Sequence, residues 1–325
     1  MKPNIIGLFF LFCIMIISCP LAIKDNNDGT AVLKEDINLY QYIPFSEGNK
    51  LATLTKNASI KFLENLPTLD GATALYPVYA SFVQAVYPSL EKYNSLSDGI
   101  LRCTTTSQAY LNLINGVVDI IFCAVPSQNQ IAMAAARGIT LNLTPIGRDA
   151  FVFFVNENNP INDITIEQIR SIYSGSITDW EEIGGEKSEI LAYQRPINSG
   201  SQTALELIME GLPIMNPPVN WIQNGMASPI DEVAAYKNYG NAIGYSFLFF
   251  TTEMVNNNQI KILSIDDVIP SFETIQTDKY PFSGSFFAIT RGNESENTIK
   301  FIEWILSDEG QYLIEKTGYV PINLN

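Results

Sequence analysis

The chain has 325 residues, of which 46% are hydrophobic and 16% are charged, so it can bury a large core, and its length favours two domains over one. The net charge of −15 argues against broad contact with nucleic acid, which needs clustered Lys and Arg. Histidine is absent, and with it the commonest general base, the usual metal ligand and the central residue of a Ser-His-Asp triad. Most hydrolases and zinc enzymes are therefore excluded, whereas carboxylate-only enzymes are not.

The N-terminal residues predict export. Lys2 gives a short basic start, and an apolar run from 5 to 17 follows, which is too short to span a bilayer comfortably. Ser18 directly before Cys19 resembles the lipobox of bacterial lipoproteins, in which the cysteine is lipidated. We therefore predict a lipoprotein signal peptide over residues 1–19, lipid on Cys19, and a location on the outer face of the cytoplasmic membrane. An ordinary signal peptide cleaved nearby is the alternative.

A polar segment rich in Asp and Asn follows and is predicted to be a flexible tether over residues 20–47. Beyond it, short apolar runs alternate with helical patterns. Helices are expected at 76–86, 107–115 and 130–136, and strands near 52–54 and 101 and at 120–124, 141–146 and 150–155. This alternation predicts an α/β fold with a mainly parallel sheet covered by helices.

A second α/β set occupies the rest of the chain. Helices are expected at 166–174, 202–209 and 230–238, strands at 190–194, 243–250 and 286–290, a loop-rich stretch at 270–280, and a final helix from 299 that continues through Gly310. Two such units place a ligand cleft between them. We expect lobe one to comprise residues 48–150 plus 281–325, and lobe two residues 151–280.

A loop of small polar residues joins a predicted strand to a predicted helix near residue 200. Arg195 directly follows the strand predicted at 190–194, and Ser199, Gly200 and Ser201 lead directly into the helix. Such a loop points backbone N–H groups and hydroxyls at one spot at the positive end of a helix, and an arginine adds a forked pair to two oxygens. The segment is therefore predicted to bind an anion, the alternative being that Ser199 or Ser201 only caps the helix.

Two further turns between strand and helix carry hydroxyl groups. Thr73 follows Asp70 and Gly71 before an apolar helix, and residues 104–107 are three threonines and a serine. In open α/β sheets such turns meet at the carboxyl ends of strands, where ligands bind. Neither Gly-x-x-x-x-Gly-Lys-Ser/Thr nor Gly-x-Gly-x-x-Gly occurs, so nucleotide binding is unsupported.

Several of these segments resemble the phosphate-binding proteins of ABC-type phosphate importers. The likeness spans nearly everything after the tether and is carried by DGATALYPVY (70–79), NGVVDIIFCAVPS (115–127), the 156–180 region with YSGSITDW, RPINSGSQT (195–203), residues 240–245 and GQYLIEKTGYVP (310–321). The resemblance implies a two-lobed type II periplasmic-binding-protein fold that holds phosphate in the cleft. It also implies a membrane permease as partner, no cofactor, no metal and no enzymatic activity, and we expect a monomer.

Carried over onto matching positions, the resemblance implies phosphate contacts from Thr73, Ala74, Thr106, Arg195, Ser199, Gly200 and Ser201. Many members also carry an aspartate shortly before the equivalent of Pro126, which accepts the proton of HPO₄²⁻, but Ala124 and Val125 stand here. Asp70 is the candidate replacement, with a capping or turn role as its alternative. A related oxyanion such as sulfate therefore stays open beside phosphate.

Two other functions stay open beside a binding protein. An enzyme acting on phosphate esters through Ser199 or Thr73 lacks any visible base or metal cluster. An adhesin or sensor on the same fold is the third reading, favoured only by the missing acid before Pro126. After removal of Cys13 and lipidation of Cys19, Cys103 and Cys123 remain, as buried thiols, which we favour, or as a disulfide.

Overall fold

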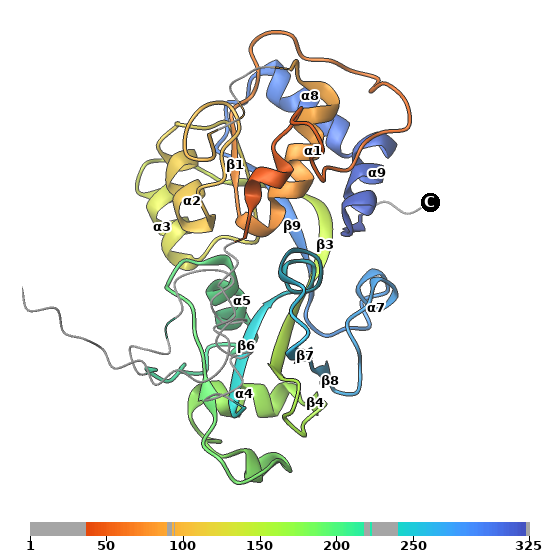
Figure 1. Ribbon diagram of the computed structural model, residues 1–325. Coiled ribbons are helices and arrows are strands. Elements are labelled where there is room, and N and C mark those ends of the chain that lie inside the picture. Colours follow the sequence, from red (N-terminus) through yellow and green to blue (C-terminus); the bar gives the residue numbers. More distant parts are fainter. Residues whose placement is uncertain (1–36, 90–92, 94, 218–221, 223–239, 323–325) are drawn as a thin grey trace, which may run out of the picture. The chain divides into compact units, whose positions relative to one another are not determined.

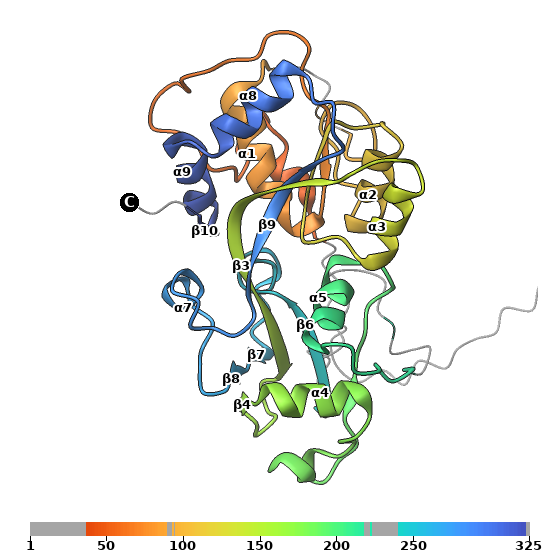
Figure 2. The same cartoon turned by 180° about the vertical axis from the view of Figure 1, so that it is seen from behind.

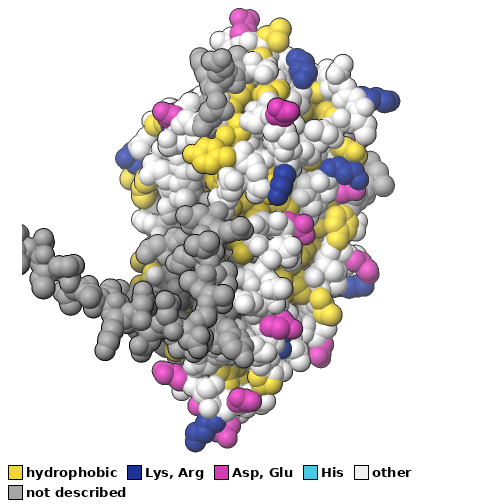
Figure 3. Space-filling model, viewed as in Figure 1, with side chains coloured by type: hydrophobic (Ala, Val, Ile, Leu, Met, Phe, Trp, Pro, Cys, Tyr) yellow, Lys and Arg dark blue, Asp and Glu magenta, His cyan; other side chains and the backbone are white. Residues whose placement is uncertain are grey.

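The computed structural model describes residues 37–89, 93, 95–217, 222 and 240–322, all of which belong to one compact unit, Glu35–Asn325. The predicted signal peptide, the lipidation site Cys19, most of the tether and the helix expected at 230–238 lie outside the described residues. Every helix in the described ranges is too short or too polar to cross a lipid bilayer. On the face shown in Figure 3, Lys and Arg side chains are interspersed with Asp and Glu and form no single basic patch.

The described chain begins with packed residues rather than with a tether. Leu39–Tyr42 forms a short 3-10 helix (η1), and Tyr42 and Ile43 are buried at 7% and 5% exposure. The N–H of Lys50 donates to the carbonyl of Gln41 (2.8 Å). The tether predicted up to residue 47 is therefore too long at its C-terminal end, because these apolar side chains join the hydrophobic core.

The first group of elements contains the first three strands and the helices between them in the chain (Figure 1). It comprises β1 (Leu69–Gly71), η2 (Thr73–Leu75), α1 (Tyr76–Val86), α2 (Thr106–Ile114), β2 (Ile120–Cys123), α3 (Gln128–Ala135) and β3 (Asn142–Asn156). No strand forms near residues 52–54, and Leu101 makes only an isolated bridge to Leu69. Apart from these two positions, strands and helices alternate here as predicted.

The second group follows from β3 to the end of the described chain. It comprises β4 (Asp163–Ile164), α4 (Ile166–Ser174), η4 (Trp180–Ile183), β5 (Leu191–Ala192), α5 (Gly200–Ile208), β6 (Ala242–Phe247), the π-helix η6 (Phe250–Val255), β7 (Ile260–Ile262), β8 (Ser264–Ile265), α7 (Phe272–Gln276), β9 (Ser283–Thr290), α8 (Glu296–Ile305), α9 (Asp308–Thr317) and β10 (Val320–Pro321). The expected final helix is thus two helices. An added Cβ on Gly310 would lie 2.3 Å from the carbonyl oxygen of Ile305, so glycine allows α9 to start close against the end of α8.

The main sheet is mixed rather than mainly parallel. In the described chain its strands follow the order β1-β2-β9-β3-β6-β5, with β7 and β10 also paired to β3. The pairs β1–β2 and β5–β6 are parallel, whereas β9 pairs antiparallel with β2 and β3, and β3 pairs antiparallel with β6 and β7. The prediction of a mainly parallel sheet is wrong because β9 returns from the C-terminal part of the chain to lie between β2 and β3.

β3 is one strand of 15 residues where the sequence predicts two. It pairs with β9 in its first part and with β6 and β7 in its second. A register shift between Pro145 and Gly147 interrupts the alternation of side chains, which explains the predicted gap. Figure 1 and Figure 2 show β3 and β9 running from the half with α1, α2, α8 and α9 towards the half with α4, α5 and β6.

Two large hydrophobic cores accompany these halves. The first packs α1, α8 and α9 near β1 and β2, and includes Tyr79, Phe82, Phe122, Phe301 and Trp304. The second is formed, apart from Val320, by residues between Ala150 and Tyr280. Separate cores fit two lobes, while the lobe boundaries at 150/151 and 280/281 stay a prediction.

Cys103 and Cys123 are free thiols, as favoured from the sequence. Burial raises the pKa of the Cys103 thiol to about 12 and that of Cys123 well above its usual range. Both are therefore poor nucleophiles at neutral pH. Within the described ranges, no group of three or more Cys, Asp or Glu side chains could hold a metal ion.

Candidate functional site

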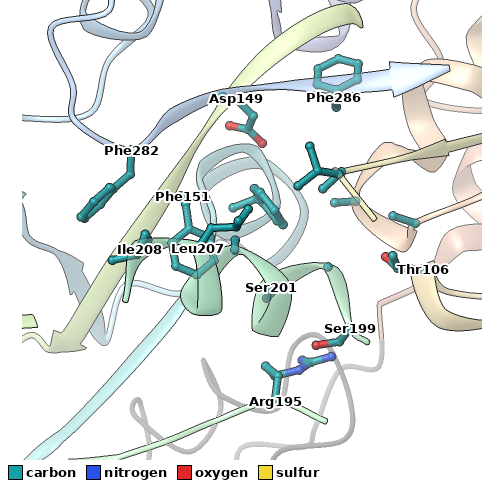
Figure 4. Close-up of a pocket in the computed structure, with 18 of the residues that line it drawn as sticks. Thr106, Asp149, Phe151, Arg195, Ser199, Ser201, Leu207, Ile208, Phe282 and Phe286 are labelled. Atoms are coloured by element: carbon teal, nitrogen blue, oxygen red, sulfur yellow. The ribbon is translucent and has the colours of Figure 1, made fainter. Parts of the chain in front are cut away.

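A cavity of about 810 Å³ lies where three turns between strand and helix meet. The residues that the resemblance assigns to the ligand all line it: Thr73, Ala74, Thr106, Arg195, Ser199, Gly200 and Ser201. We call this set the anion end. Figure 4 shows Arg195 and Ser199 pointing toward each other below Ser201, with Thr106 to one side.

The first loop of the anion end follows β1. A Cβ on Gly71 would lie 2.6 Å from the carbonyl oxygen of Phe122, so only glycine lets the chain turn this close to β2. Ala72 then leads into η2, and no side chain caps the start of that helix. Its first N–H groups, beside the hydroxyl of Thr73, are therefore available to an anion.

Asp70 organises this loop instead of lining the cavity. It is fully buried and accepts hydrogen bonds from the N–H of Gly71 (2.8 Å), the N–H and hydroxyl of Thr104 (2.9 and 2.6 Å) and the side-chain amide of Asn112 (2.7 Å). Its carboxylate thereby ties the first loop to the second. The structure places Asp70 in the structural role that was the alternative, and the candidate role as proton acceptor for phosphate has no geometric support, because donors already surround both oxygens.

The second loop carries backbone strain at Thr105. This residue has φ 75° and ψ 161°, a region that β-branched side chains avoid and that costs of order 1–3 kcal/mol. Strain of this kind concentrates at ligand sites. Helix α2 begins immediately afterwards, at Thr106, without a side-chain cap. The strained turn thus places an uncapped helix N-terminus and the hydroxyl of Thr106 at the cavity.

The third loop enters α5 with its own cap. Ser199 accepts a hydrogen bond from the N–H of Gln202 (3.2 Å), so the capping role that was the alternative is present. A hydroxyl that accepts this bond still has its proton to donate to a ligand. Gly200 and Ser201 occupy the first turn of α5, where backbone N–H groups have no partner within the helix.

Arg195 is held in place through its backbone. Its N–H donates to the hydroxyl of Tyr245 (2.9 Å) and to the side-chain oxygen of Gln202 (3.0 Å). Burial lowers the pKa of the guanidinium to about 10, with the neighbouring Tyr245 opposing the shift. The side chain therefore keeps its positive charge at neutral pH, at the end of the cavity where the helix N-termini meet.

A cluster of hydrogen bonds joins the third loop to α2 and α3 through Asn198. Its carbonyl accepts from the hydroxyl of Ser107 (2.9 Å) and the side chain of Gln130 (3.3 Å), and its side-chain oxygen accepts from the hydroxyl of Ser127 (2.8 Å). Asn198 has φ 68°, which asparagine tolerates better than most residues. We call this cluster the Asn198 clamp. The sequence analysis missed it, since only an Asn in a polar turn signals it.

The other end of the cavity is apolar. Helix α5 contributes a stripe at three- and four-residue spacing, and β3, β6 and the residue just before β9 contribute aromatic rings. We call this part the apolar trough, formed by Ala204, Leu207, Ile208, Phe151, Phe247 and Phe282. Figure 4 shows Phe151, Leu207 and Ile208 together, with Phe282 beyond them. The trough was not predicted from the sequence.

Two carboxyl groups line the cavity, those of Asp149 and Glu210. Glu210 pairs with Arg170 (2.7 Å) at the rim. Asp149 accepts hydrogen bonds from the N–H groups of Ala150 (2.8 Å) and Phe249 (3.4 Å), and burial raises its pKa to about 7 despite these bonds. Ala124 and Val125 line the cavity without an acid, as the sequence predicts. Asp149 was not a candidate in the sequence, because it lies between the strands predicted at 141–146 and 150–155.

A family model for a PBP superfamily domain matches residues 65–309 of this chain. This chain belongs to the PBP superfamily. The resemblance carried by the loop motifs is confirmed, and so is the two-lobed type II fold that it implies. The match covers the three loops of the anion end and all of the apolar trough.

Individual relatives of this PBP superfamily member point the same way. Phosphate-binding protein PstS of Borreliella burgdorferi is 23% identical over 264 residues, covering 80% of this chain and 91% of the relative. PstS of Bacillus subtilis is 23% identical over 257 residues, covering 78% and 80%. A solved Clostridium perfringens structure, described as a phosphate ABC transporter substrate-binding protein with bound phosphate, superposes with a TM-score of 0.62 at 24% identity, covering 79% of this chain and 99% of that one.

Proposed function

We propose that this protein is an extracytoplasmic solute-binding protein that captures inorganic phosphate and delivers it to the permease of an ABC importer. The observation that carries the proposal is the convergence of three helix-starting loops and Arg195 on one end of a single cavity. The names of the relatives, which are phosphate-binding proteins, support phosphate as the oxyanion. The protein is a binding protein and not an enzyme on this proposal.

The chemistry of the anion end suits a dehydrated oxyanion. Backbone N–H groups at the starts of η2, α2 and α5 supply fixed partial positive charge, while Thr73, Thr106 and Ser201 supply hydroxyl donors. Arg195 adds a full charge in a forked geometry. The net charge of −15 does not oppose this, because salt screens distant surface charges more than these local dipoles.

Anchoring and delivery complete the proposal. Lipid on Cys19 would hold the protein at the outer face of the cytoplasmic membrane, and the segment after it would let a monomer reach the permease. Closure of lobe two, residues 151–280, on lobe one, residues 48–150 plus 281–325, would enclose the ligand, because both proposed lobes contribute residues that line the cavity.

Titration calorimetry of the full-length chain with phosphate and with sulfate tests the proposal. We expect Arg195→Ala to weaken phosphate binding by about tenfold to a hundredfold, because it removes charge-assisted hydrogen bonds worth roughly 1.5–3 kcal/mol each. Arg137→Ala, which removes an exposed arginine outside the cavity, is the matched control and should bind normally. If Arg195→Ala binds phosphate with unchanged affinity, phosphate does not bind at this site. If the protein binds sulfate but not phosphate, the ligand is sulfate.

A further inference from the structure

The cavity is much larger than the anion end requires. Its volume is about 810 Å³, whereas a water molecule takes up only about 30 Å³ of liquid. An oxyanion built around one central atom fills a small part of such a space. Volumes of roughly 300–1,000 Å³ are typical of pockets for small organic molecules.

This volume persists although the loops around the anion end are already in contact. The Asn198 clamp joins the third loop to α2 and α3 by hydrogen bonds of 2.8–3.3 Å. A Cβ added to Gly200 would lie 3.2 Å from the hydroxyl oxygen of Thr106, so the second and third loops meet closely. The remaining space is therefore a feature of the apolar trough and does not arise from separation at the anion end.

The apolar trough has the surface of an organic binding site. Phe151 and Phe247 pack edge to face with ring centroids 5.6 Å apart, and Phe282 continues the aromatic wall. Leu207 is 57% exposed, which is a cost for an apolar side chain unless something covers it. The trough is continuous with the anion end along α5, since Ser201, Ala204 and Ile208 lie on one face of that helix.

The anion end itself favours an oxyanion without a proton to donate. Its side chains are hydroxyls and a guanidinium, and Ala124 and Val125 offer no acceptor from theirs. A P–OH group there can donate to side-chain hydroxyl oxygens, but these accept a weaker hydrogen bond than a carboxylate does. A phosphate monoester avoids this weaker bond, because its ionised oxygens only accept hydrogen bonds and its remaining oxygen is bonded to carbon.

We propose that this site, if it binds phosphate as proposed above, also takes phosphate monoesters that carry a compact apolar or aromatic group, with the phosphate at the anion end and the organic group in the apolar trough. No bond is made or broken, since the ester is bound whole. Arg195 and the loop N–H groups hold the phosphate, while Leu207, Phe151 and Phe282 cover the organic group.

The test compares inorganic phosphate, methyl phosphate and phenyl phosphate by calorimetry on the full-length chain. We expect phenyl phosphate to bind at least about tenfold more tightly than methyl phosphate, because an aromatic ring buries enough apolar surface in the trough for one such step in affinity. Leu207→Ser should weaken phenyl phosphate about fivefold more than it weakens inorganic phosphate. Leu212→Ser is the matched control, since Leu212 is 49% exposed but does not line the cavity, and should change neither.

The outcomes separate this inference from the proposed function. The inference is overturned if phenyl phosphate binds no better than methyl phosphate, or if Leu207→Ser does not weaken its binding. In either case, binding of inorganic phosphate leaves the proposed function standing. Binding of phenyl phosphate without inorganic phosphate supports the inference and makes the ester the ligand. Failure of all three probes overturns both.

Discussion

The anion end and the apolar trough share one cavity but are assembled differently. Each loop of the anion end is a continuous segment in which a strand, a small polar turn and a helix follow each other, so its chemistry is local in the chain. The trough collects side chains from α5, β3, β6 and the residue just before β9, which meet only in the folded protein. Recognition of charge is therefore encoded locally here, whereas the size and shape of the cavity depend on tertiary structure.

The largest effect is expected from removing the buried support of the anion end. Asp70→Ala should lower the free energy of unfolding by roughly 2–4 kcal/mol, because it leaves the donors of Thr104 and Asn112 buried without their acceptor. Urea unfolding measures this. Asp119→Ala is the control: Asp119 also accepts two hydrogen bonds, from Thr68, but is exposed, and its loss should cost about 1 kcal/mol or less. Equal costs would show that Asp70 is no special support.

A smaller effect is expected at the Asn198 clamp. Asn198→Gly keeps the positive φ but removes the side-chain oxygen that Ser127 contacts at 2.8 Å. Phosphate affinity should fall about threefold to tenfold, because this oxygen accepts a neutral hydrogen bond from Ser127 and a longer one, at 3.4 Å, from Asn129. Asn293→Gly, at another positive φ outside the cavity, should leave affinity unchanged. If both variants bind alike, the clamp does not contribute to the anion end.

The smallest effect is expected at Asp149 and depends on pH. Because burial raises the pKa of Asp149 to about 7, the folded state binds more protons than the unfolded state between the ordinary carboxyl pKa of about 4 and that value. The free energy of unfolding contributed by this group therefore falls as pH rises through this window. Asp149→Asn removes the effect, so its melting temperature should rise relative to wild type by about 2–4 °C from pH 5 to pH 8. A difference that stays constant with pH contradicts this account.

The sequence predicted those parts of the fold whose pattern is local. The helices Tyr76–Val86 and Ile166–Ser174 form over the predicted residues, the latter ended by Gly175 in the left-handed conformation. β3 was divided because a bulge breaks the alternation on which strand prediction depends. The antiparallel position of β9 could not be inferred, since strand pairing is a long-range property.

In the site, too, the residues in local motifs were predicted and those with long-range partners were not. All seven residues assigned by resemblance line one cavity, whereas Asp70 lies behind it. Asn198 and Asp149 were missed because an Asn in a turn and an Asp between two apolar runs look like ordinary surface residues in the sequence. Their roles depend on groups far away in the chain, such as Ser127 for Asn198 and Phe249 for Asp149.

The continuity of β3 has a mechanical consequence. The strand is hydrogen-bonded to β9 before and after the shift at Pro145 and Gly147, and then to β6 and β7. Rotation of one core relative to the other cannot take place in a loose linker at this crossover and has to bend a paired strand. The register shift interrupts the pairing of β3 with β9. Gly147 packs there so closely against Phe286 that a Cβ would lie 2.3 Å from the ring. The two halves are therefore joined through a hydrogen-bonded strand, and any change in the angle between them has to distort that strand.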